Sequence, residues 1–396
     1  MIVSVMADSS PRSNAQSLIT WLDATVVAVA LAVVVGGITR LTESGLSITE
    51  WKPVSGVLPP LSTADWAAAF EGYLQIPEAQ TVHKGITLGA FKALYWWEWV
   101  HRILARLVGL VIAVPYFWFL ARRRLPASLR LRLAFLPVLV AAQGVLGWYM
   151  VSSGLSGRIS VSQYRLVAHL ALALVILVIA LWTSASLRAA RDGAPEGGAG
   201  AGGAGAGGAG AGGAGTGGAG TGGAGAGGAL REDARPGSPP RDSAGAGWWP
   251  RLTDAFAIWT FAVILTGGFV AGLDAGKIFN TFPLMGGQWV PPAYWMQAGF
   301  LANAFENPVA AQFHHRVLAI ATVLIALALW IGAKAHNAPA RLLTAQRNVA
   351  LVASVQVGLG IVTLLLSVPV AVAALHQLVA VAMLGAAVIA AHAARR

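Results

Sequence analysis

The chain has 396 residues, of which 56% are hydrophobic and only 11% are charged, with a formal net charge of +11. This balance indicates a protein embedded in a membrane and excludes an ordinary soluble domain. Cysteine is absent, which excludes disulfides and every metal or redox site that depends on a thiolate.

The chain opens with a polar, irregular stretch and continues with eight apolar runs. Residues 1–18 lack the basic start and short apolar core of a cleavable signal, so we expect a cytoplasmic tail there. Each apolar run approaches or exceeds the roughly 20 residues that a spanning helix needs. Pro369 limits continuation of the seventh run, which predicts a tight turn at residues 367–371. The predicted spans are residues 19–39, 94–120, 131–152, 162–186, 251–272, 308–333, 343–367 and 370–392.

Basic residues gather in alternate connections between these spans. All of them fall on one side of the membrane if the N-terminus is cytoplasmic, which is the positive-inside pattern. We therefore expect both termini in the cytoplasm and explain the positive charge without nucleic acid. The residues concerned are Arg122, Arg123, Arg124, Arg130, Arg132, Arg188, Arg191, Lys334, Arg341, Arg347, Arg395 and Arg396.

A Gly/Ala-rich tract at residues 197–229 separates the fourth and fifth spans and has the composition of a flexible linker. The spans on its two sides resemble each other in the same order. An even number of helices in each copy predicts a parallel repeat, not an inverted one. The sequence thus predicts an all-α integral membrane protein built as two tandem four-helix bundles. The expected parts are a first half at residues 19–190, a cytoplasmic linker at 191–250 and a second half at 251–396.

The repeat is carried by four matched stretches. "GGITRLTESG" at 36–45 matches "GGFVAGLDAG" at 267–276, and "EWVHRILA" at 98–105 matches "QFHHRVLA" at 312–319. Two further pairs are "QGVLG" with "QVGLG" and "AHLALALVI" with "LHQLVAVAM", at residues 143–147, 356–360, 168–176 and 375–383.

Four of the eight histidines occupy repeat-related positions, near the starts of the second, fourth, sixth and eighth spans: His101, His169, His315 and His376. A single histidine in a span is most simply explained by an interhelical hydrogen bond. Four at matching positions, all at similar depth toward the extracytoplasmic face, favour axial ligation of haem iron. Two facing helices in each half can hold one porphyrin. We interpret His83, His336 and His392 as solvated or interfacial, and the repeat selects His315 over His314.

The halves differ in the charged residues beside these histidines. Glu98 lies three residues before His101, whereas Gln312 stands in that place before His315. Glu98 either forms a salt bridge with Arg102 or relays protons and stabilises a developing cation beside the iron. The nearby arginines either extend toward the membrane edge or pair with haem propionates. These arginines are Arg102, Arg106, Arg165 and Arg316. The asymmetry suggests a reactive first-half site and an electron-transferring second-half site.

Long stretches covering nearly the whole chain outside the tail and linker resemble the heme A synthase family. They are "GGITRLTESGLSITEWKPVSGVLPP", "FKALYWWEWVHRILARLVG", "QGVLGWYMVSSGL", "YRLVAHLALA", "GGFVAGLDAGKIFNTFPLMGGQWVPP", "QFHHRVLA" and "LHQLVA". The resemblance implies an oxidoreductase acting on CH or CH2 groups. It would hydroxylate a methyl of haem O successively to a geminal diol, which loses water to give the formyl of haem A for terminal oxidase assembly.

The resemblance also implies roles for individual residues. Haem b would be bound by His315 and His376, the substrate haem O by His101 and His169, and Glu98 would serve catalysis. Haem O synthase and cytochrome oxidase assembly factors are the implied partners, besides membrane lipid. The chain departs from some members in lacking a cysteine pair in the first outer loop.

Two other classes compete with this interpretation. A dihaem membrane cytochrome b linked to quinol would usually stack its haems across the bilayer, whereas the four histidines here lie toward one face. A transporter would leave those histidines and Glu98 without a role. The absence of an Arg/Ser-rich transit peptide favours a bacterial inner membrane, and the sequence leaves homo-oligomerisation open.

Overall fold

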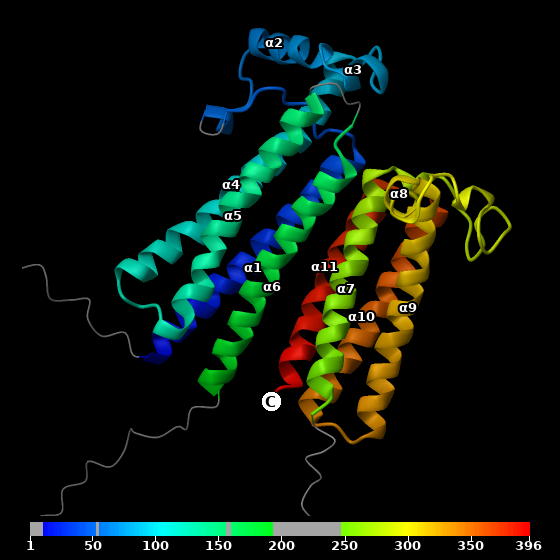
Figure 1. Cartoon of the computed structure of the whole chain (residues 1–396). Coiled ribbons are helices and arrows are strands. Elements are labelled where there is room, and N and C mark those ends of the chain that lie inside the picture. Colours follow the sequence, from blue (N-terminus) through cyan, green and yellow to red (C-terminus); the bar gives the residue numbers. More distant parts are fainter. Residues whose placement is uncertain (1–10, 53–54, 156–159, 193–246) are drawn as a thin grey trace, which may run out of the picture.

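The computed structural model describes residues 11–52, 55–155, 160–192 and 247–396, and within them it is helical without any β-strand (Figure 1). Eight helices are long and apolar enough to cross a membrane, which confirms the eight predicted spans. The predicted Gly/Ala tract lies outside the described residues. The eight helices are α1 (Pro11–Leu41), α4 (Leu88–Ala121), α5 (Ala127–Leu155), α6 (Gln163–Asp192), α7 (Trp249–Gly272), α9 (Pro308–Ala335), α10 (Ala340–Leu365) and α11 (Val370–Ala393).

The eight helices form two groups of four that stand side by side in Figure 1. In the first half, α1 and α5 each pack against both α4 and α6. In the second half, α7 and α10 each pack against both α9 and α11. The halves meet where α1 packs on α11 and α6 on α7, with further contacts between α6 and α11 and between α1 and α7. Every packing pair therefore has a counterpart in the other half, although the internal repeat itself stays a prediction.

Local sequence explains where several helices begin. The Thr87 side chain accepts a hydrogen bond from the Ala90 amide and caps α4, while Asn307 accepts one from Val309 and caps α9. Between α10 and α11 the backbone turns through Ser367 and Val368, both with left-handed φ, and Pro369 precedes α11. The predicted tight turn is thus confirmed.

The connections at residues 42–87 and 273–307 lie at the same end of the bundle, which we call the loop end (Figure 1). They contain three short helices that hydropathy did not predict: α2 (Thr63–Leu74), α3 (Pro77–Thr81) and α8 (Phe300–Glu306). They also contain the 3-10 turns η1 (Ser55–Val57), η3 (Ala275–Lys277) and η4 (Pro292–Tyr294). A capping box between Ser62 and Asp65 starts α2, which is a sequence signal for a helix. In addition, α1 begins at Pro11, so residues 11–18 of the expected tail are helical.

The spanning helices bury one side and leave the other free for lipid. Leu22 of α1 is completely buried beside α4 and α6 residues of the first-half core, whereas Leu31 of the same helix is 50% exposed. Lipid tails are as apolar as leucine, so the packed side is stabilised mainly by close van der Waals contact.

This difference makes a testable prediction for two leucines of one helix. Leu22→Ala should lower the free energy of unfolding by about 2–4 kcal/mol because it leaves a cavity. Leu31→Ala should change it by less than about 0.5 kcal/mol because it removes atoms that face lipid. Unfolding in mixed micelles titrated with a denaturing detergent measures both, and equal losses would contradict the packing described.

Candidate functional site

The structure brings the four predicted histidines together as two pairs near the loop end. His101 of α4 lies within electrostatic range of His169 of α6. His315 of α9 is likewise close enough to His376 of α11 for their charges to interact. All four side chains are partly buried, and each pair comes from two helices of one half.

Each of these imidazoles packs its Cε1 atom against a glycine of a neighbouring helix. A Cβ added to the glycine would lie only 2.8–3.2 Å from that ring carbon. Real Cβ atoms rarely approach so closely, so each ring position depends on the missing side chain. The pairs are Gly36 with His101, Gly147 with His169, Gly267 with His315, and Gly360 with His376.

The hydrogen bonds around His315 indicate which ring nitrogen is free. The Thr266 hydroxyl donates to the Val263 carbonyl at 2.7 Å, which uses its proton. Thr266 Oγ1 lies 2.8 Å from His315 Nδ1 and therefore accepts a hydrogen bond from it. With the proton on Nδ1, the lone pair of Nε2 is left for a metal, as in metal-ligating histidines generally.

The residues present fit a porphyrin better than a bare metal ion. Among the residues that the structure describes, no group of three or more His, Cys, Asp or Glu is placed to hold an ion. Two imidazoles from facing helices, each backed by glycine, can instead supply the two axial ligands of one haem. The Nδ1 atoms of His101, His169 and His376 are buried without a hydrogen-bond partner, and Nε2 of His376 lies 3.4 Å from the Gln356 amide nitrogen.

Glu98 is 2% exposed and forms four hydrogen bonds at the base of the first-half loop. Its Oε2 accepts from Ser47 Oγ at 2.8 Å and from the Ile48 amide at 2.7 Å. Its Oε1 accepts from Arg102 Nε at 3.0 Å and Nη2 at 2.5 Å. The salt bridge to Arg102 is therefore present, and the carboxylate is held in a fixed position one turn from His101.

Arg102 and Arg316 hold the two loops in the same manner. Arg102 donates to the Ile48 and Glu50 carbonyls at 2.8 and 3.1 Å. Arg316 donates to the Phe279 and Thr281 carbonyls at 2.6 and 2.7 Å. These contacts favour a loop-holding role for both arginines over pairing with haem propionates.

The other two predicted arginines have different surroundings. Arg106 donates to the Lys52 carbonyl at 3.1 Å, again in the first-half loop. Arg165 stacks over the Tyr149 ring at 4.3 Å and donates to its hydroxyl, while its Nη1 is buried without a partner. Arg316 Nε is likewise buried without a partner, but Arg165 differs from the other three predicted arginines in donating to no loop carbonyl of the described residues.

The remaining histidines belong to neither pair, although His314 directly precedes His315, and each contacts a partner of another kind. His83 bonds Tyr73, His314 bonds Tyr294, His336 packs on Trp248, and His392 contacts Ser186 and Trp182.

The first-half loop also holds a buried carboxyl that sequence reasoning missed. Glu78 is 6% exposed, and the Tyr73 hydroxyl lies 3.5 Å from its Oε1 and 2.5 Å from His83 Nδ1. Burial and the nearby Glu98 and Glu43 raise the pKa of Glu78 to about 8, opposed by Arg40, and burial raises the pKa of Tyr73. The signal available was a glutamate within the otherwise apolar run Ile76–Pro77–Glu78–Ala79.

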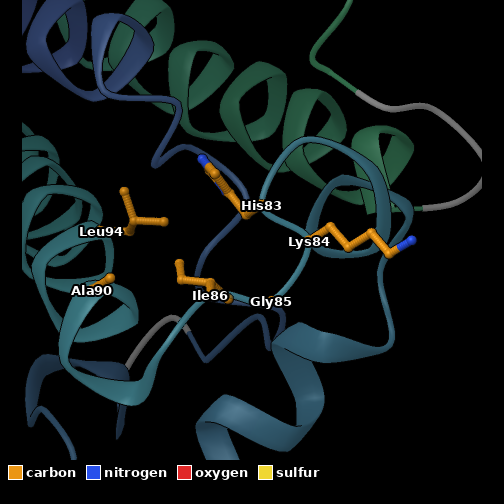
Figure 2. Close-up of a pocket in the computed structure, with 6 residues that line it drawn as sticks. All are labelled: His83, Lys84, Gly85, Ile86, Ala90 and Leu94. Atoms are coloured by element: carbon orange, nitrogen blue, oxygen red, sulfur yellow. The ribbon is translucent and has the colours of Figure 1, made fainter.

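His83 also borders a small cavity between the turn that precedes α4 and the start of that helix. The cavity has a volume of about 370 Å³ and is lined by Lys84, Ile86, Ala90 and Leu94 as well (Figure 2). It is open at the surface, and none of the four paired histidines lines it.

Fold and site together define a multi-pass helical membrane protein with two paired-histidine sites suited to porphyrins. A family model described as cytochrome oxidase assembly protein (COX15-CtaA) matches residues 19–211 and 228–388. The chain belongs to this family.

Similar proteins extend over nearly the whole chain. A heme A synthase of Chelativorans sp. (strain BNC1) is 39% identical over 97% of this chain and 92% of its own length. A heme A synthase of Rhizobium meliloti (strain 1021) is 40% identical over 95% of this chain and 89% of its own length. A heme A synthase of Rhizorhabdus wittichii is 41% identical over 98% of this chain and 96% of its own length.

The buried Glu78 predicts a pH-dependent stability. Its pKa is raised on folding from 4.5 to about 8, so the folded protein holds this proton where the unfolded chain has lost it. Stability is therefore lost as the pH rises between these values, at about 1.4 kcal/mol per unit of pKa difference. Glu78→Gln should match the wild type near pH 5 and melt at a higher temperature near pH 9.

Glu71→Gln, an exposed substitution on the preceding helix α2, is the control and should follow the wild type at both pH values. Thermal melts in detergent measure all three proteins. A Glu78→Gln variant that stays parallel to the wild type across this pH range would show that Glu78 titrates normally.

Proposed function

We propose that this protein is a heme A synthase, which oxidises a methyl group of haem O to the formyl group of haem A. The observation that carries the proposal is a pair of similarly built histidine sites, only one of which has a carboxylate beside its histidine. Glu98 stands beside His101, and Gln312 stands in the equivalent place beside His315. Relatives about 40% identical over nearly the whole chain carry the name heme A synthase. Nothing in these relatives favours the alternative of a quinol-linked cytochrome.

The second half holds the resident haem b between His315 and His376. Thr266 supports this assignment because it orients His315 with Nε2 free. Val35 occupies the matching position before Gly36, so the first half has no such hydroxyl. When bound, haem b supplies one-electron oxidation and reduction.

The first half binds the substrate haem O between His101 and His169, with Arg165 available for a propionate. Glu98 lies one turn before His101 on α4 and can accept protons that leave as the substrate methyl is hydroxylated. Arg102, Ser47 and the Ile48 amide fix the position of its carboxylate. Gln312 cannot accept a proton in this way, which is why the reaction belongs to the first half.

The loop end faces the extracytoplasmic side, and both termini lie in the cytoplasm of a bacterial inner membrane. The support is the basic residues, which gather in the connections at the opposite end, such as Arg122–Arg124 between α4 and α5. The two halves are copies of one four-helix unit, which their matching helix contacts support. Partner proteins in oxidase assembly deliver haem O to this protein and receive haem A from it.

The first prediction of this proposal concerns Glu98. Glu98→Gln should keep both haem sites but lower haem A formation at least about 100-fold, because the amide cannot accept a proton. Chromatography of extracted haems from cells that also express a haem O synthase measures it. Glu50→Gln, an exposed substitution in the same loop, is the control. Normal haem A formation by Glu98→Gln would remove Glu98 from the mechanism.

The second prediction separates the two haem sites. His315→Ala should lose the resident haem b because an axial ligand is removed, and the pyridine haemochrome spectrum should show this loss. His336→Ala at the far end of the same helix should keep it. Retention of a full equivalent of haem b in His315→Ala would show that the resident site lies elsewhere.

A further inference from the structure

One side chain connects the two histidine sites across the boundary between the halves. Gln377 directly follows His376 on α11, and its Nε2 donates a hydrogen bond to the Val33 carbonyl of α1 at 3.0 Å. The two residues are 344 positions apart in sequence. The backbone that carries a second-half histidine is therefore tied directly to a first-half helix.

Two consecutive glycines of α1 contact the two sites, Gly37 on the side of Gln377 and Gly36 on the side of His101. A Cβ on Gly37 would overlap the Gln377 amide, and a Cβ on Gly36 would lie 2.8 Å from His101 Cε1. Neighbouring residues of a helix point about 100° apart, so α1 has Gln377 on one side and the His101 ring on another. The Gln377 amide and the His101 imidazole thus contact adjacent residues of α1.

The repeat-related contact, between α7 of the second half and α6 of the first half, is apolar. Gly268, which matches Gly37, faces Val167 and Leu170 of α6. Leu170 follows His169 as Gln377 follows His376. Apolar packing is thus sufficient to join the halves at this level, and the amide of Gln377 adds a directed bond from the second half to the first.

We propose that Gln377 is a positioning residue that couples the two haem sites. It fixes α11 at His376 against the glycine pair of α1, and this pair in turn sets the position of the His101 ring. A change at either site is transmitted to the other through this contact, and the coupling is reciprocal. The assignment of haems to the sites rests on the proposed function, whereas the contact does not.

The test measures a first-half property after a second-half substitution. Full-length protein in lipid nanodiscs is loaded with ferric protoporphyrin IX, and its low-spin signals are recorded by electron paramagnetic resonance. His315→Ala identifies the signal of the first-half site, because the second-half haem is lost. In that background, Gln377→Leu should shift the first-half signal and weaken porphyrin binding there about 3- to 30-fold.

Two further variants sharpen this test. Gly37→Ala displaces the Gln377 amide from the other side and should reproduce the effect of Gln377→Leu. Leu378→Ala changes the next residue of α11, which is 42% exposed, and should leave the first-half signal unchanged.

The outcomes separate the two proposals. An unchanged first-half signal and affinity in both Gln377→Leu and Gly37→Ala would overturn the coupling and leave the proposed function intact. Failure of the His315→Ala protein, in which the other variants are made, to bind a porphyrin in the first half would overturn both proposals.

Discussion

An imidazole can lie flush against a neighbouring helix only where that helix has no Cβ, and the rest of this structure depends on this constraint. It recurs four times, at Gly36, Gly147, Gly267 and Gly360, always against the Cε1 atom of one histidine. A glycine in a helix interior costs roughly 0.5–1 kcal/mol relative to alanine. In return, each histidine ring packs directly against the helix next to its own: α1 against α4, α5 against α6, α7 against α9 and α10 against α11. The glycine contacts therefore hold each of the four rings in place within its half.

Built on this shared scaffold, the halves diverge through a few substitutions. Arg102 and Arg316 each hold the loop of their half through two carbonyls two residues apart, so this anchoring is common to both halves. The position of Glu98 in the first half is occupied by Gln312 in the second, which therefore lacks this proton acceptor. Val35 becomes Thr266, which adds a hydroxyl that orients His315. The proposed assignment of the substrate haem to the first half and the resident haem to the second rests on these differences.

Much of this could be predicted from sequence because its signals are local or repeated. Hydropathy predicts the eight spans, and the matched stretches select His101, His169, His315 and His376 from eight histidines. Contacts with backbone carbonyls leave no pattern in a sequence, so the loop-holding role of Arg102 and Arg316 was not predicted. The burial of Glu78 depends on how α2 and α3 fold back over the bundle, and the bond from Gln377 to Val33 joins distant segments. Neither could be derived from composition or periodicity.

The most direct measurement of the central claim is a cryo-electron microscopy structure of the protein purified with its haems in lipid. The account predicts one planar density between His101 and His169 and another between His315 and His376. Each imidazole should ligate iron through Nε2 while its Cε1 stays against the glycine. Density held by other side chains, or rings turned away from the four glycines, would contradict it.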